Sequence, residues 1–330
     1  MNLTTSLIIE GNDHNGFPDL IHWRGNFYLA FRVAKNHIDP HSTIKIYASS
    51  DTQSWIPLAE LRLDDEDIRD PKFAVIGDQL FLYALRTRSK TLDAMPYTTI
   101  FCTSRDGAIW TPWQGISPAN WVFWRPKTND GTRWYVAADD RKRKRSALFT
   151  SLDGINWDKV SSIHSGEFHA EIELAFLANQ DLLCTIRVEG TEGRPRTLLG
   201  HAGHPYRAWH LASNHLTRLD GAVSFIYRGQ VFSVGRFEPN PLFKMGHYLN
   251  QKRTALFCSN AHNLVWLADL PSSGDTGYAA VVILDDTAFV AYYTSAPDTN
   301  YPWLVGQFRP TQIRLARIHL PDLARLTAQT

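Results

Sequence analysis

The stretch that decides the fold covers residues 170–187 and reads Ala-Glu-Ile-Glu-Leu-Ala-Phe-Leu-Ala-Asn-Gln-Asp-Leu-Leu-Cys-Thr-Ile-Arg. Glu171 opens an apolar run, the polar residues 179–181 interrupt it, and a second apolar run ends at Arg187. Two runs of strand length around a short polar turn predict a β-hairpin. Because a hairpin brings its two ends together, we expect Glu171 and Arg187 to lie side by side.

The same plan recurs along the chain with a spacing of about fifty residues, which is typical of propeller blades. The predicted hairpins cover residues 19–32, 70–86, 125–140, 171–187, 220–236 and 278–293. They predict an all-β fold, a six-bladed β-propeller of four-stranded antiparallel blades, in a single domain over residues 1–330. A lone strand over residues 5–9 is expected to complete the last blade.

A second pattern, Ser-x-Asp-x-x-x-Trp, recurs in register with the hairpins at residues 49–55, 104–110 and 151–157. An Asp side chain that accepts backbone N–H groups, followed by a turn residue and a packing Trp, indicates a structural turn. We therefore expect these segments to support the blades and to lie away from the chemistry.

Composition limits the classes of function. The chain has 330 residues, 44% of them apolar, and a formal net charge of +1, which predicts no nucleic-acid partner. No basic, apolar leader and no run of eighteen apolar residues occurs, so no membrane association and a cytoplasmic location are expected. Cys102, Cys184 and Cys258 lie in apolar runs, and no metal-ligand spacing occurs, so no metal or cofactor is expected. The oligomeric state stays open.

The first strand of each propeller blade lines the central axis, and the second returns to the same end of the channel. The residues that open the hairpins are therefore expected in an inner ring: Asp19, Asp70, Arg125, Glu171, Asp220 and Tyr278. Those that close them are expected in an outer ring: Arg32, Arg86, Asp140, Arg187, Arg236 and Tyr293. So many charges in one funnel indicate either an anion-binding site or a ring of structural ion pairs. The basic run 141–145 is either a solvated loop or part of an anion-facing rim.

These hairpins resemble the blades of the sialidase (neuraminidase) family, propellers with Asp-box or BNR repeats. Glu171 and Arg187 are spaced as in the sialidase blade that begins with Glu and ends with Arg. Tyr278, with Tyr293 fifteen residues later, resembles the strand of the nucleophilic tyrosine. The Ser-x-Asp-x-x-x-Trp segments resemble the Asp-box and are one residue shorter. Gly16 stands where sialidases carry the first arginine of a three-arginine clamp.

The resemblance implies a divergent sialidase-like glycoside hydrolase acting on a small or oligomeric sugar substrate that bears a carboxylate. Tyr278 would be the nucleophile, Glu171 its base and Asp39 the acid/base residue. Arg187 and Arg236 would form two arms of the clamp on the substrate carboxylate. Further substrate contacts are expected from Arg32, Arg86, Arg125, Asp19, Asp70, Asp220 and Tyr293.

Three alternatives remain open. Residues 69–71, Arg-Asp-Pro, and the segment 151–157 also resemble five-bladed furanosidases and mannoside phosphorylases. In that case paired carboxylates such as Asp19, Glu171 and Asp220 would perform the chemistry. The other two alternatives are a non-catalytic glycan-binding propeller and a polysaccharide lyase.

Overall fold

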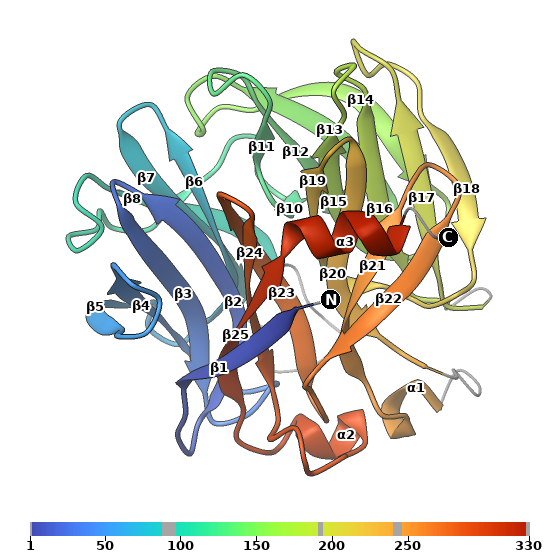
Figure 1. Ribbon diagram of the computed structural model, residues 1–330. Helices are drawn as coiled ribbons and strands as arrows, with labels where there is room; N and C mark the ends of the chain where they lie inside the picture. Colours follow the sequence, from blue (N-terminus) through green and yellow to red (C-terminus); the bar gives the residue numbers. More distant parts are fainter. Residues whose placement is uncertain (1, 88–96, 191–193, 240–245, 328–330) are drawn as a thin grey trace.

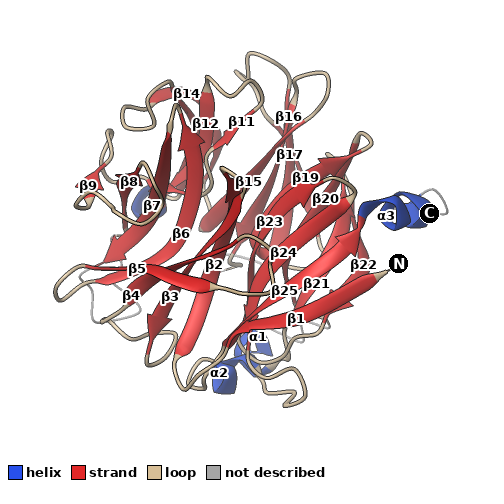
Figure 2. Cartoon of the chain, turned by 60° about the vertical axis from the view of Figure 1, so that its left-hand side comes forward, coloured by secondary structure: helices blue, strands red, loops and turns tan. Residues whose placement is uncertain are grey.

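The computed structural model describes residues 2–87, 97–190, 194–239 and 246–327. In this part of the chain, six antiparallel sheets stand around one axis as the blades of a propeller (Figure 1). Strands make up most of the regular structure, and the helices are short (Figure 2). The prediction of a six-bladed, all-β propeller is confirmed, and the five-bladed alternative is wrong.

The first three blades follow the order of the chain. Blade one contains β2 (His14–Trp23), β3 (Asn26–Ala34), β4 (Thr43–Ser49) and β5 (Ile56–Arg62). Blade two contains β6 (Asp67–Ile76), β7 (Gln79–Thr87), β8 (Thr98–Ser104) and β9 (Gln114–Gly115). Blade three contains β10 (Val122–Phe123), β11 (Lys127–Thr128), β12 (Trp134–Asp140), β13 (Arg145–Ser151) and β14 (Asp158–Ser165). Its inner strand is thus split into two short pieces, both paired with β12.

The other three blades have uninterrupted inner strands. Blade four contains β15 (His169–Phe176), β16 (Leu182–Val188), β17 (Arg196–Ala202) and β18 (His210–Asn214). Blade five contains β19 (Asp220–Tyr227), β20 (Gln230–Phe237), β21 (Arg253–Ser259) and β22 (Leu264–Leu270). Blade six contains β23 (Thr276–Leu284), β24 (Thr287–Thr294), β25 (Gln312–His319) and the first strand of the chain, β1 (Leu3–Ile9).

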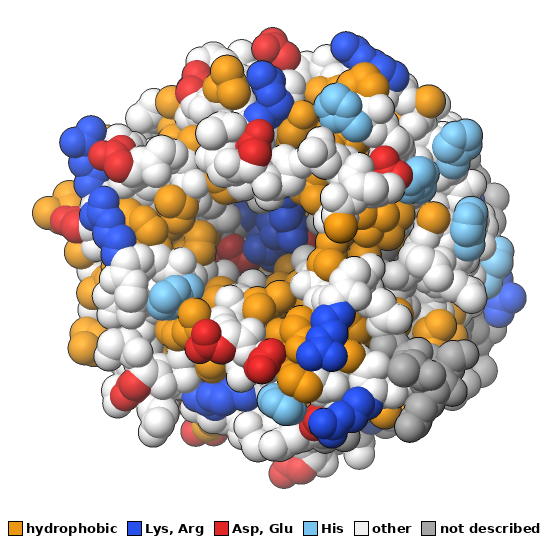
Figure 3. All heavy atoms as spheres, turned by 45° about the horizontal axis from the view of Figure 1, so that its top comes forward, with side chains coloured by type: hydrophobic (Ala, Val, Ile, Leu, Met, Phe, Trp, Pro, Cys, Tyr) orange, Lys and Arg blue, Asp and Glu red, His pale blue; other side chains and the backbone are white. Residues whose placement is uncertain are grey.

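The described helical segments are the 3-10 turn η1 (Arg141–Arg143) and the helices α1 (Gly246–Leu249), α2 (Trp303–Gly306) and α3 (Leu320–Thr327). Helices α1 and α2 lie together at one end of the axis (Figures 1 and 2). Among the described residues, none of these helices has the length and apolar character that crossing a membrane would require. Figure 3, in which the top of Figure 1 comes forward, shows a hollow at the centre of the ring with Lys and Arg side chains on its floor.

The three Ser-x-Asp-x-x-x-Trp segments form the same hydrogen-bonded turn. In the segment 151–157, Asp153 Oδ1 accepts the backbone N–H groups of Ile155 and Asn156, both at 2.8 Å. The Trp157 indole N–H donates to the carbonyl oxygen of Gly154 at 3.0 Å, and its ring packs in the core between blades two and three. These turns therefore fix how neighbouring blades pack.

Five inner strands share a β-bulge near their first residues. In β15, the pairing with β16 shifts between Ala170 and Glu173, so that two residues of β15 oppose one of β16. Equivalent shifts occur in β2, β6, β19 and β23. The first bulged residue has a positive φ in every case: Phe17 (55°), Asp70 (52°), Glu171 (55°), Gly221 (60°) and Tyr278 (49°). Positive φ is uncommon for residues other than Gly, and such strained positions concentrate at functional sites.

Candidate active site at the mouth of the central channel

The bulges surround a cavity of about 760 Å³ at the end of the axis where α1 and α2 lie. Four of the five bulge residues with positive φ line it: Phe17, Asp70, Glu171 and Tyr278. Charged residues make up much of the remaining wall: Arg69, Arg141, Lys142, Arg187, Glu189, Arg218 and Arg236. Aromatic and imidazole rings complete it: His37, Tyr97, Phe168, His247, Tyr248 and Trp303. The bulges thus turn side chains from four separate blades towards one space.

Tyr278 and Glu171 meet across this cavity. The Tyr278 hydroxyl donates to Glu171 Oε1 at 2.7 Å and accepts a hydrogen bond from Arg187 Nη1 at 3.1 Å. The guanidinium carbon of Arg236 lies 5.2 Å from the centre of the Tyr278 ring. Burial raises the pKa of Tyr278 well above its ordinary value, and the Glu171 charge raises it further, while Arg187 and Arg236 oppose that shift. The phenol is therefore protonated at rest, with a proton acceptor and Arg187 beside its oxygen and Arg236 over its ring.

Gly221 makes this meeting possible. Its bulge lies on blade five, between those of Glu171 on blade four and Tyr278 on blade six. A Cβ at Gly221 would lie 2.6 Å from Cγ of Tyr278, which is closer than two non-bonded carbon atoms can pack. The backbone N–H of Gly221 donates to Glu171 Oε2 at 2.7 Å. The absence of a side chain therefore gives Tyr278 room, and the amide fixes Glu171.

A chain of ion pairs links the arginines of blades four and five. Glu189 contacts Arg187 Nη2 at 2.5 Å with one carboxylate oxygen and Arg218 Nη1 at 2.6 Å with the other. Asp220 in turn accepts from Arg218 at 2.7 Å and from Arg236 at 2.9 Å. Burial alone would raise the pKa of Glu189, but the charges of Arg187 and Arg218 lower this pKa to about 2. The three guanidinium groups are thus held in one cluster, with a carboxylate of the chain itself between two of them.

Two more arginines enter the cavity from blades two and three. Arg69 pairs with Asp67 at 2.6 Å between Nε and Oδ2, and Arg141 pairs with Asp139 at 3.1 Å. Among the described lining residues, six carry a positive charge and three a carboxylate. Asp67 and Asp139, which do not line the cavity, each hold one of these two arginines. The position of each arginine is therefore fixed before any ligand arrives.

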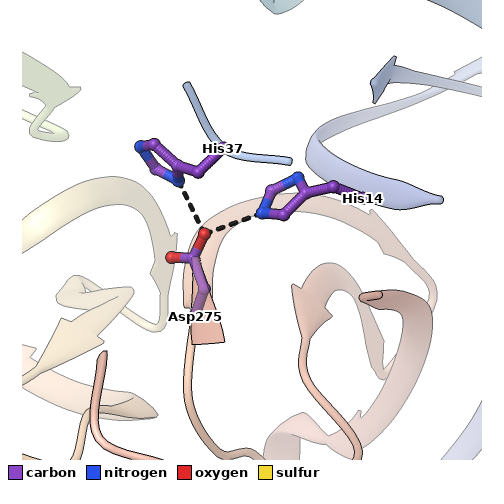
Figure 4. A group of neighbouring side chains, drawn as sticks. All are labelled: His14, His37 and Asp275. Carbon is purple, nitrogen blue, oxygen red and sulfur yellow. Dashed lines mark hydrogen bonds and ion pairs between the residues drawn. The ribbon is translucent and has the colours of Figure 1, made fainter. Parts of the chain in front are cut away.

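His14, His37 and Asp275 converge beside the cavity (Figure 4). Oδ2 of Asp275 contacts His14 Nε2 at 2.8 Å and His37 Nδ1 at 2.6 Å. Its Oδ1 accepts from the Tyr293 hydroxyl and from the Trp303 indole, both at 2.8 Å. The ligand atoms of the three residues lie within 4.8 Å of one another, and this donor set suits a metal ion such as zinc. Since both oxygens of Asp275 are already saturated by hydrogen bonds, the arrangement works as a hydrogen-bonding hub that orients His37 and Trp303.

The structure brings five of the sequence-predicted site residues into the cavity: Tyr278, Glu171, Arg187, Arg236 and Asp70. It keeps Asp39 outside. The Asp39 carboxylate accepts the backbone N–H groups of Lys35 and His41, each at 2.9 Å, and so stabilises its own loop. His37, two residues earlier in that loop, lines the cavity in its place.

Six other predicted substrate contacts also lie outside the cavity, in ion pairs or hydrogen bonds with the chain itself. Arg32 pairs with Asp67 at 2.9 Å, and Arg86 lies 3.8 Å from Glu66. Arg125 pairs with Asp19 in the interior of the channel. Asp220 holds Arg218 and Arg236, and Tyr293 donates to Asp275. The expected inner ring is corrected at two positions, because the bulges put Phe17 and Gly221, and not Asp19 and Asp220, in the place equivalent to Glu171.

Sequence reasoning did not select Arg69, Glu189, Arg218 or His37 as site residues. Arg69 and Arg218 stand one and two residues before a predicted inner-ring carboxylate, and Glu189 stands two residues after Arg187. Their position beside the predicted ring residues is the sequence feature that could have identified them as site residues. Their side chains reach the cavity because they lie next to the bulges or at strand ends.

No family model matches this chain, and no curated protein sequence matches it either. Solved structures do. The chain superposes on a protein of unknown function from Dyadobacter fermentans DSM 18053 with a TM-score of 0.71 and 19% identity, over 96% of this chain and 98% of that one.

Sialidases are among the other similar structures. A mutant of Trypanosoma rangeli sialidase with trans-sialidase activity gives a TM-score of 0.71 at 12% identity, over 98% of this chain and 60% of that one. The NanB sialidase of Streptococcus pneumoniae gives 0.66 at 11% identity, over 96% and 71%. The chain has the six-bladed propeller fold of the sialidases. At these identities the likeness extends to the fold, and the function of this sialidase-like propeller rests on its own cavity.

Proposed function

We propose that this sialidase-like propeller is a glycoside hydrolase that acts on a sugar carrying an acidic group. The observation that carries the proposal is the 2.7 Å hydrogen bond from the Tyr278 hydroxyl to Glu171 in a cavity rich in arginines. A phenol next to a carboxylate has the arrangement of a nucleophile with its base.

In the first step, Glu171 takes the phenolic proton as the Tyr278 oxygen bonds to the anomeric carbon and the glycosidic C–O bond breaks. Arg187, which already donates to the Tyr278 oxygen, stabilises the negative charge that develops there. In the second step, water replaces the tyrosine at the anomeric carbon and the proton returns from Glu171 to the phenolate. The leaving oxygen takes up one proton in the first step and the attacking water gives one up in the second, so the two steps together amount to hydrolysis and need no redox partner.

The charge of the cavity supports an acidic substrate. Six lining residues are cationic and three are carboxylates, and Arg187 and Arg236 flank Tyr278 itself. A substrate carboxylate would also repel a carboxylate nucleophile, which explains the use of a neutral phenol. Arg218 supplies a third arginine to the cluster. It comes from a different place in the chain than the first clamp arginine of sialidases, where this chain has Gly16.

A panel of aryl glycosides and acidic oligosaccharides, tested with the wild type and with Tyr278→Phe, decides the proposal. We expect turnover of at least one acidic glycoside, lost by on the order of 10³-fold or more in Tyr278→Phe. Glu171→Gln should lose turnover too, because a neutral amide cannot accept the phenolic proton. Circular dichroism of both variants checks that the fold is retained.

Other outcomes lead to the alternatives. Full turnover by Tyr278→Phe would contradict the tyrosine route. Binding of an acidic glycan without turnover of any glycoside by the wild type would favour a glycan-binding propeller. Release of an unsaturated sugar from an acidic polysaccharide would favour a lyase.

A further inference from the structure

We propose that Asp70 is the general acid that protonates the leaving group, the role that the family resemblance implied for Asp39. The inference rests on the proposed function and identifies a further residue of the same site. Asp70 occupies on blade two the bulge position that Glu171 occupies on blade four and Tyr278 on blade six.

The placement of Asp70 suits that role. The three bulges are each two blades apart, so their side chains approach the cavity from three evenly spaced directions. Asp70 has a φ of 52° and lines the cavity with the other two residues. A sugar whose anomeric carbon faces Tyr278 can therefore direct the glycosidic oxygen, on the far side of that carbon, towards Asp70.

Asp70 differs from the other carboxylates of the cavity in its contacts. Glu171 and Glu189 both form ion pairs with Arg187. The carboxyl group of Asp70 makes no hydrogen bond and no ion pair with any described residue, and its Oδ1 is buried without a partner. A buried polar atom left unpaired in a functional cavity needs an explanation. Protonation of Asp70, followed by donation to a substrate oxygen, provides one.

The surroundings of Asp70 favour the protonated acid. Burial raises its pKa above the ordinary value, and the Glu171 charge raises it further. Lys72, Arg69 and Arg141 act in the opposite direction without reversing the shift. Two carboxyl groups whose environments separate their protonation states are the usual arrangement of an acid and a base in one site.

The Asp70 O–H gives its proton to the glycosidic oxygen as the C–O bond breaks, and the electron pair of that bond goes to the leaving oxygen. The bond from the Tyr278 oxygen to the anomeric carbon forms at the same time, and Glu171 receives the phenolic proton. In the second step, the Asp70 carboxylate takes a proton from the attacking water and returns to its starting state.

Leaving-group dependence tests this assignment. The substrates are two glycosides of the acidic sugar that the wild type accepts, one with 4-nitrophenol and one with methanol as the leaving group. Asp70→Asn should lose about 10²–10⁴-fold in kcat/KM on the methyl glycoside, which needs protonation. On the 4-nitrophenyl glycoside the loss in the bond-breaking step should be under about tenfold, because 4-nitrophenolate leaves without a proton.

Asp39→Asn is the matched control, since it removes the carboxylate that the resemblance favours. It should change kcat/KM by the same factor on both substrates, because Asp39 acts only by stabilising its own loop. With Asp70→Ala, added azide should restore turnover of the 4-nitrophenyl glycoside, because azide attacks the anomeric carbon without a base. A carboxyl-carbon NMR titration, assigned by comparison with Asp70→Asn, should show Asp70 titrating above the ordinary aspartate value of about 3.9.

Equal losses on both substrates by Asp70→Asn, with activity still lost in Tyr278→Phe, would overturn the role of Asp70 and leave the proposed function standing. So would an Asp70 carboxyl that titrates at or below the ordinary value. Selective loss on the methyl glycoside in Asp39→Asn would return the role to Asp39. Absence of any turnover by the wild type would remove the function and the role together.

Discussion

Glu189 is the residue that determines how open the arginine cluster is to a ligand. Its two oxygens lie 2.5 Å and 2.6 Å from Arg187 and Arg218, where a substrate carboxylate would otherwise bind. Charge-assisted pairs of this kind are strong and directional. If the substrate is acidic, as we propose, it must displace Glu189 or bind beside it.

Replacing Glu189 with Gln should tighten the binding of an acidic sugar. The change removes one negative charge next to two arginines, and we expect a gain of about 1–2 kcal/mol. Isothermal titration with glucuronate and with N-acetylneuraminate measures it, with glucose as the neutral ligand. Glu167→Gln is the matched control, because Glu167 pairs with Arg196 at 2.7 Å outside the cavity. An equal gain for glucose, or weaker binding of both acids, would contradict the expectation.

Glu238 should make the fold sensitive to acid. It is buried against His247 at 2.8 Å and Lys252 at 2.5 Å. Burial alone would raise its pKa, but the His247 hydrogen bond and the Lys252 charge lower it from 4.5 to about 2. The folded pKa is thus depressed, so the stabilisation is fully present above about pH 4.5 and is lost as pH falls towards 2, by about 3 kcal/mol.

Urea denaturation across that pH range measures this effect. Glu238→Gln should lower stability at pH 7 and flatten the fall between pH 4.5 and 2. Glu60→Gln, at a half-exposed side chain, is the control and should keep the slope of the wild type. An unchanged slope in Glu238→Gln would show that other carboxyl groups govern the acid response.

At the scale of elements, the turn at 151–157 ties blade three to blade two. Gly154 has a φ of 77°, and an added Cβ would lie 2.4 Å from Ile76 Cδ1 and 2.8 Å from the Tyr83 hydroxyl oxygen. Gly131 has a φ of 74° in the β11–β12 turn, and a Cβ there would meet nothing within 4 Å. The two glycines share a backbone conformation and differ in their packing.

Gly131→Ala should therefore destabilise the fold by about 1–2 kcal/mol, from the backbone term alone. Gly154→Ala should lose about 1–3 kcal/mol more, since its methyl group overpacks the contact between blades. Chemical denaturation of the two variants gives the difference. Equal destabilisation by the two variants would mean that the core between the blades accommodates the methyl group of Gly154→Ala with no loss of free energy.

The hairpins were predictable because turn residues and apolar runs are local in sequence, as in 170–187. The meeting of Tyr278 and Glu171 followed from the ring arrangement of the blades. The bulges were not predictable, because Glu171 and Tyr278 are not residue types that favour a positive φ. The hairpin pattern therefore predicted Asp19 as the equivalent of Glu171, although it lies two residues beyond the bulge position and pairs with Arg125.

At the scale of the whole molecule, blade six joins the two ends of the chain. β1 pairs antiparallel with β25 and is the outermost strand of that blade (Figure 1). Leu3, Ile8 and Ile9 of β1 pack partly buried against the cores on either side. The same blade carries Tyr278 on its innermost strand, so the closure of the ring and the position of the tyrosine depend on one sheet.

Deleting residues 1–10 should destabilise the fold by about 3–5 kcal/mol, the value expected for three half-buried aliphatic side chains and the loss of their strand. It should also cause association at high concentration, because β25 becomes an exposed edge that pairs with other chains. Thermal denaturation and size-exclusion chromatography measure the two effects. A synthetic peptide of residues 1–11 should reverse both by adding the missing strand to β25, whereas a scrambled peptide should not. If the shortened chain melts at the temperature of the full chain and elutes identically, then β1 only covers an already closed ring, and the Tyr278 site does not depend on it.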